Sequence, residues 1–257
     1  MSGRGCCGVR KTMSQTPGPG KSIAIDKRII FALDVESPKT AREWVRRLEG
    51  DIGFYKVGLQ LFLAGGFGII DWIVKRGMEV MVDLKFFDVP QTVASAVSQL
   101  RDRGISLTTV HGNDAILEAA VTAGYDVKIL AVTVLTSLDE GDLRDLGFQC
   151  SPEELVLSRA RRALRIGCAG VVSSGLEASR LRHELGDRFL VVVPGVRPVA
   201  NRADDQKRVV DVRAAFLNGA DYIVVGRPIR QAANPHELVA GMKVSIKEAL
   251  EAREAGG

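Results

Sequence analysis

The chain has 257 residues, 46% of them hydrophobic and 26% charged, which is the composition of an ordinary globular protein. This composition excludes a disordered chain, and neither the glycine period of collagen nor the heptads of a coiled coil occur. The longest uncharged stretch, Val57 to Ile70, has 14 residues, whereas a membrane-spanning helix needs about 18 or more.

The net charge of +4 comes from the N-terminus, because residues 1–28 carry six basic side chains against one acidic one. A basic tail on a nearly neutral body does not indicate a nucleic-acid-binding fold. The tail lacks the apolar core of a secretory signal and is rich in Gly, Pro and Ser. We therefore predict a disordered extension over residues 1–26, one domain over residues 27–257, and a cytoplasmic location.

The residue types that most often bind zinc are scattered along the chain. No C-x-x-C pair occurs, and the histidines are far apart. The residues concerned are Cys6, Cys7, Cys150, Cys168, His111, His183 and His236. We expect no metal site, and a reducing compartment fits the cysteine usage.

From Lys27 onward, short apolar runs rich in β-branched residues alternate with longer amphipathic segments. The predicted strands are 28–35, 53–58, 78–85, 105–112, 127–137, 169–174, 189–196 and 221–227. Helical patterns lie between them, for example over 38–50, 90–104, 151–167 and 212–220. Several helical segments close on glycine, as helix C-termini often do. These glycines are Gly50, Gly77, Gly104, Gly167 and Gly219.

Strands that alternate with helices pair in parallel, and eight such units predict a (β/α)8 TIM barrel. An open doubly wound sheet is the alternative. The first strand is not followed by the G-x-G-x-x-G that would favour it.

Ionisable residues cluster near the C-terminal ends of the first three predicted strands. Asp34, Lys56, Asp83 and Lys85 occupy strand positions that share a face with apolar barrel-lining residues, and Asp88 follows in the third loop. Asp83 and Lys85 are two residues apart, about 6.5–7 Å along a strand. Active sites of TIM barrels lie at this end, and clustered ionisable groups concentrate at functional sites. A structural network of ion pairs is the alternative reading.

The seventh and eighth strands both end in glycine and arginine, in PGVR (194–197) and VGR (225–227). Glycine lets backbone N–H groups approach an anion, and arginine offers a planar fork for two phosphate oxygens. Because the loops after strands seven and eight often bind phosphate in this fold, we predict a phosphate site there.

The segment DLKFFDVPQT (83–92) resembles the D-x-K-x-x-D-[IV]-P-x-T signature of orotidine 5′-phosphate decarboxylase. Further segments resemble this family in the same order, over roughly residues 28–245. They are ALD (32–34), YKVG (55–58), VTVLTS (132–137), PGVR (194–197), DDQ (204–206) and VVGR (224–227). The resemblance implies a homodimeric barrel that converts orotidine 5′-monophosphate to UMP and CO2 without cofactor or metal.

The resemblance also implies a role for each matching residue. Lys85 is similar to the lysine that protonates C6 of the pyrimidine, and Asp83 to the carboxylate held beside that of the substrate. Lys56 matches the lysine that anchors this aspartate and touches the ribose, and Asp34 matches a ribose-hydroxyl ligand. A fixed ammonium at Lys85 would stabilise negative charge that develops at C6.

The remaining matches concern the partner subunit and the rest of the substrate. Asp88 and Thr92 resemble residues that reach into the partner's site, and Thr136 resembles a pyrimidine contact. The phosphate end is matched by Arg197, Gln206, Gly226 and Arg227. Val89 and Gln91 are mild variants within the signature. His111 we interpret as structural, because Lys85 already supplies the proton.

Other functions stay open. A magnesium-dependent sugar-phosphate decarboxylase or synthase of the same superfamily shares D-x-K-x-x-D, but such enzymes place an acidic ligand where this chain has Lys56. A catalytically silent phosphate-binding barrel would not need Asp83, Lys85 and Asp88 together. A nucleic-acid binder is supported only by the basic tail.

Overall fold

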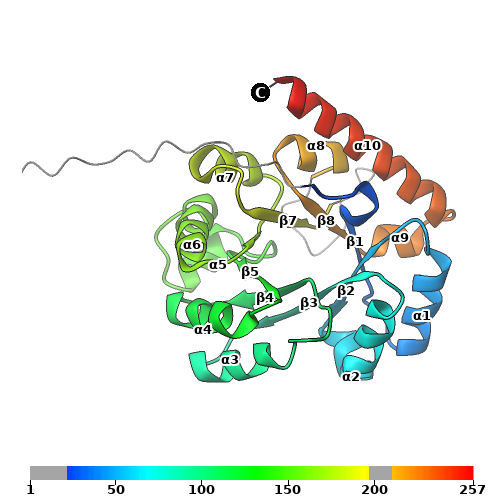
Figure 1. The fold of residues 1–257 in the computed structure, drawn as a ribbon. Helices are drawn as coiled ribbons and strands as arrows, with labels where there is room; N and C mark the ends of the chain where they lie inside the picture. The colour runs from blue at the N-terminus through cyan, green and yellow to red at the C-terminus, as the bar shows by residue number, and fades with distance from the viewer. Residues whose placement is uncertain (1–21, 197–209, 257) are drawn as a thin grey trace, which may run out of the picture.

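The computed structural model of the protein describes residues 22–196 and 210–256. Its core is a closed barrel of eight parallel strands in sequence order, in which the first strand pairs with the last, so the open sheet is excluded. Figure 1 shows the helices arranged around these strands. The strands are β1 (Ile29–Ala32), β2 (Phe54–Gly58), β3 (Glu79–Phe86), β4 (Leu107–His111), β5 (Lys128–Val132), β6 (Gly170–Val172), β7 (Leu190–Pro194) and β8 (Tyr222–Val225). The predicted TIM barrel is confirmed.

Every crossover between consecutive strands that lies within the described ranges contains a helix. The helices between consecutive strands are α1 (Pro38–Arg47), α2 (Leu59–Val74), α3 (Pro90–Ser98), α4 (Asp114–Gly124), α5 (Glu140–Asp145), α6 (Pro152–Ile166) and α7 (Ala178–Leu185). In the described part of the connection between β7 and β8 lies α8 (Val212–Leu217). A short helix, η1 (Ile25–Lys27), precedes β1, and α9 (Arg227–Gln231) and α10 (Pro235–Gly256) follow β8. None of the helices seen in the described part of the chain has both the length and the apolar character needed to cross a membrane.

Local sequence explains where several helices begin and end. The Ser37 hydroxyl accepts a hydrogen bond from the Thr40 N–H (3.1 Å) at the start of α1, and Ser151 and Glu154 form a capping box on α6. The glycines expected to close helices all have positive φ, the left-handed conformation that favours glycine. Their φ values are 87° at Gly50, 77° at Gly77, 70° at Gly104, 103° at Gly167 and 107° at Gly219.

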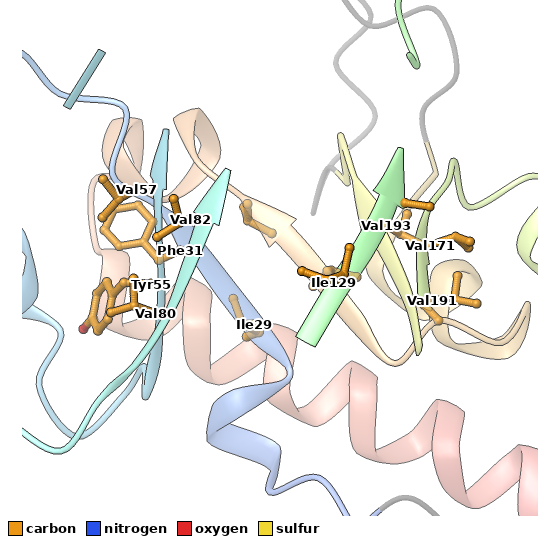
Figure 2. Close-up of a cluster of buried hydrophobic side chains, with 14 of the residues drawn as sticks. Ile29, Phe31, Tyr55, Val57, Val80, Val82, Ile129, Val171, Val191 and Val193 are labelled. Carbon is orange, nitrogen blue, oxygen red and sulfur yellow. The ribbon is translucent and has the colours of Figure 1, made fainter. Parts of the chain in front are cut away.

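Apolar side chains fill both faces of the barrel wall, as the near-continuous apolar strands require. A first set points into the barrel: Ile30, Phe54, Met81, Leu107, Leu130, Val192 and Tyr222. The alternate residues point outward and pack under the helices, as Figure 2 shows for Ile29, Phe31, Tyr55, Val57, Val80, Val82, Ile129, Val171, Val191 and Val193. This rigid wall holds the charged residues at its C-terminal end in place.

Candidate active site

Four charged side chains form an alternating chain across the C-terminal ends of β1, β2 and β3. The Lys56 ammonium lies 2.9 Å from Asp34 Oδ1 and 3.5 Å from Asp83 Oδ2, and the Lys85 ammonium lies 2.8 Å from Asp83 Oδ1. Gly58 leaves room for this chain, since a Cβ there would lie 3.0 Å from the Lys56 ammonium. The structure therefore brings together the four residues that the sequence placed at one mouth of the barrel.

The two central side chains of this row of four charges are buried, and the two outer side chains are partly exposed to solvent. The side chains of Lys56 and Asp83 are 10% and 12% exposed, whereas those of Asp34 and Lys85 are 47% and 40% exposed. Burial by itself would raise the pKa of Asp83, but the positive charges of Lys56 and Lys85 and hydrogen bonds from Lys85 and Thr109 outweigh it, so that the pKa lies below its ordinary value. Asp83 is thus ionised at neutral pH and is held between the side chains of Lys56 and Lys85.

The sequence predicted a regular third strand, but the structure interrupts its pairing at the charged residues. Val82 pairs with Thr108 and Phe86 with Val110, so four steps along β3 match two along β4. Within this bulge Lys85 has a φ of 48°, a conformation that is strained for a residue with a side chain. Bulges near active sites re-aim side chains. Here the bulge lets Asp83 and Lys85 form a direct ion pair.

Thr109 belongs to the same cluster, although it was not among the predicted site residues. It is fully buried. Its hydroxyl donates to Asp83 Oδ1 at 2.9 Å and accepts from the Lys85 backbone N–H at 3.0 Å. A threonine inside a β-rich run is ordinary, so no local signal distinguished it from its neighbour Thr108.

A cavity of about 460 Å³ opens beside the charged chain at the C-terminal end of the barrel. It is lined by all four charged residues and by Gly226 and Arg227 at the end of β8, the strand that pairs with β1. Thr136 lines the wall after β5, together with apolar residues. A Cβ at Gly226 would lie 3.2 Å from Ala32 Cβ, so only glycine fits there without displacement. The volume is in the usual range for small-molecule sites.

Two predicted site residues do not line this cavity. Asp88 and Thr92 are exposed, and the Asp88 carboxylate accepts a hydrogen bond from the adjacent Val89 N–H. Arg197 and Gln206, predicted at the phosphate end, lie outside the described residues. Of the four residues predicted at the phosphate end, the structure describes Gly226 and Arg227, and both line the cavity.

Neither His111 nor the buried cysteine contributes to the cavity lining. The His111 ring stands edge-on to Phe87 at 5.2 Å, and burial, followed by the positive charge of Arg159, lowers its pKa. Burial raises the pKa of Cys168 to about 12, which makes the thiol a poor nucleophile and metal ligand. Within residues 22–196 and 210–256, no three His, Cys, Asp or Glu side chains are grouped so that they could hold a metal ion.

Comparison with known proteins identifies relatives along nearly the whole chain. A profile of the orotidine 5′-phosphate decarboxylase / HUMPS family matches residues 27–242. The orotidine 5′-phosphate decarboxylase of Methylococcus capsulatus is 57% identical over 234 residues, which cover 90% of this chain and 97% of that protein. The protein of the same name from Stenotrophomonas maltophilia is 43% identical, with coverage of 94% and 100%.

A solved structure agrees with these sequence matches. The crystal structure of orotidine 5′-phosphate decarboxylase from Lactobacillus acidophilus superimposes with a TM-score of 0.76 at 33% identity, and covers 86% of this chain and 99% of that one. With the barrel, the charged mouth and these relatives in agreement, the chain belongs to the orotidine 5′-phosphate decarboxylase / HUMPS family.

Proposed function

We propose that this protein decarboxylates orotidine 5′-monophosphate to UMP and CO2, with Lys85 as the proton donor to C6 of the pyrimidine. The observation that carries the proposal is the chain of alternating charges from Asp34 through Lys56 and Asp83 to Lys85, at the wall of a nucleotide-sized cavity. The names of the relatives agree with the reaction.

The residues around the cavity suit the parts of this substrate. Gly226 and Arg227 would hold the phosphate at one side, together with the predicted Arg197 and Gln206. Thr136 would contact the pyrimidine, and Asp34 and Lys56 would bind the ribose. This arrangement would place C6 and its carboxylate beside Asp83 and Lys85, which line the cavity.

The chemistry then needs only charges held in place. When the C6–carboxylate bond breaks, its electron pair stays on C6 and CO2 leaves. The Lys85 ammonium, held by Asp83 at 2.8 Å, stabilises that negative charge and then transfers a proton to C6. Asp83 also repels the substrate carboxylate, by about 4 kcal/mol at 4 Å and an effective dielectric constant near 20. Departure of neutral CO2 relieves this repulsion.

The expected homodimer gives Asp88 and Thr92 a role. Both are exposed and lie away from the cavity of their own subunit, on a segment where Phe87 and Val89 are also exposed, at 67% and 62%. Exposed apolar side chains of this size favour a protein contact. In the proposed dimer this segment packs against a second copy, and Asp88 and Thr92 complete the partner's site.

A magnesium-dependent reaction on a sugar phosphate is the second candidate, because the matching family name also covers HUMPS proteins. The charged position near the C-terminal end of β2 decides between the two. It holds Lys56, whose ammonium already lies between the carboxylates of Asp34 and Asp83. A divalent cation next to it would be repelled, so these carboxylates suit the ammonium better than a metal.

The test is the loss of orotate-ring absorbance from orotidine 5′-monophosphate in the presence of EDTA. We expect full turnover with the chelator, and Lys85→Ala should lower kcat by about a thousandfold or more. Lys128→Ala is the matched control, since Lys128 is exposed at the N-terminal end of β5, away from the cavity. Abolition of activity by EDTA, or substantial turnover by Lys85→Ala, would contradict the proposal.

A further inference from the structure

We propose that Thr109 is a positioning residue that sets the geometry of the Asp83–Lys85 pair through a single buried hydroxyl. The inference rests on the proposed decarboxylation and adds a determinant of its rate. Thr109 lies on β4, opposite the bulge of β3 that carries both charged residues. Its hydroxyl forms one hydrogen bond with the Asp83 carboxylate and another with the Lys85 backbone N–H.

The backbone of the bulge explains why a side chain is needed. In a regular parallel sheet, each N–H of β3 would donate to a carbonyl of one of its two neighbouring strands. Here the register shifts between Val82 and Phe86, and the Lys85 N–H instead donates to the Thr109 hydroxyl at 3.0 Å. The hydroxyl thus satisfies a backbone donor at the residue that has the strained φ of 48°.

The same hydroxyl also sets the orientation of the carboxylate. It donates to Asp83 Oδ1 at 2.9 Å, and that oxygen also accepts from the Lys85 ammonium at 2.8 Å. A hydroxyl has one donor hydrogen and two acceptor lone pairs, so both of its bonds form at once. With Oδ1 held on this side, Oδ2 faces Lys56 at 3.5 Å.

Removal of the hydroxyl should therefore act on two groups together. The Lys85 backbone would lose its partner in the bulge, and the Lys85 ammonium would no longer be held toward C6. The groups facing Asp83 would be Lys56 from β2 and Lys85 from β3, with Asp34 behind Lys56. Since a hydrogen bond to a carboxylate favours its charged form, its loss raises the pKa of Asp83.

Thr109→Val tests the proposal, because valine keeps the shape of threonine and lacks the hydroxyl. Thr108→Val is the matched control: Thr108 is also fully buried on β4, but its hydroxyl donates to the Val82 carbonyl at 2.9 Å and not to the charged cluster. Thr109→Ser restores the hydroxyl. For each variant kcat and KM would be measured across pH, with thermal unfolding as the measure of folding.

We expect Thr109→Val to lower kcat about tenfold to a hundredfold with a smaller change in KM, as misplacement of reacting groups does. The acid limb of its kcat profile should move to higher pH, and Thr109→Ser should recover most of both effects. Thr108→Val should keep the wild-type profile. Wild-type kcat in Thr109→Val, or equal losses in both valine variants, would overturn the positioning role. Absence of decarboxylation in the unaltered protein would instead overturn the proposed function.

Discussion

At the scale of single residues, Asp83 is a buried carboxylate whose charge depends on its neighbours. It is buried among two lysines and a threonine hydroxyl, and its pKa is lowered although burial opposes this. A carboxyl with a lowered pKa stabilises the fold above its unfolded pKa of about 4, and this contribution is lost as pH falls through the folded value. Asp83→Asn should therefore lower the free energy of unfolding at pH 7, by about 1.5–3 kcal/mol.

Urea unfolding at several pH values would check this prediction, and the gap between the two proteins should narrow below about pH 4. Asp34→Asn is the control, because Asp34 is half exposed and contacts only Lys56 within the cluster; its loss should cost less than about 1 kcal/mol. If Asp83→Asn were as stable as the wild type at pH 7, the cost of burying the carboxylate would cancel the stabilisation that its partners provide, and the prediction would be wrong.

At the scale of elements, β6 and β7 approach each other at Gly170 too closely for a side chain. A Cβ at Gly170 would lie 2.2 Å from the Leu190 carbonyl oxygen and 2.6 Å from Leu190 Cβ. Since a backbone atom cannot move aside cheaply, Gly170→Ala should destabilise the barrel by about 1–3 kcal/mol. The midpoint of urea unfolding would show the change.

Gly68 provides the matched control for this substitution. It is exposed on α2, and a Cβ there would meet nothing within 4 Å. Because alanine is a better helix former than glycine, Gly68→Ala should raise stability by about 0.5–1 kcal/mol. Equal effects of the two substitutions on stability would show that the close contact between β6 and β7 does not make alanine unfavourable at Gly170.

At the scale of the whole molecule, the proposed dimer predicts that active sites are shared between subunits. Lys85→Ala and Asp88→Ala would each be inactive alone if Asp88 acts in the partner's site. Random mixing of the two makes half of the dimers hybrids, each with one intact site, so about a quarter of wild-type activity should return. Co-expression followed by the absorbance assay would measure it, with light scattering for the oligomeric state. No recovery in dimeric hybrids would place Asp88 in its own subunit's site.

Features that depend on local chemistry and on chain order could be predicted from the amino-acid sequence. Alternation of apolar runs with helical patterns predicted the eight strands, and the terminal glycines marked helix ends because glycine adopts the left-handed conformation without the strain that a side chain adds. The D-x-K-x-x-D spacing indicated the family, which the comparisons confirm. Asp34, Lys56, Asp83 and Lys85 were predictable as a group, since parallel strands of a barrel end at one mouth.

The contacts among these groups depend on strand pairing and could not be predicted from the sequence. The bulge in β3 depends on its pairing with β4, and no property of residues 83–85 alone specifies the shifted register. The role of Thr109 follows from that shift, because its hydroxyl meets Asp83 and Lys85 from a different strand 24 or more residues away. Thr108 and Thr109 are identical in type and adjacent in the chain. Only the barrel, which turns their side chains to different partners, distinguishes them.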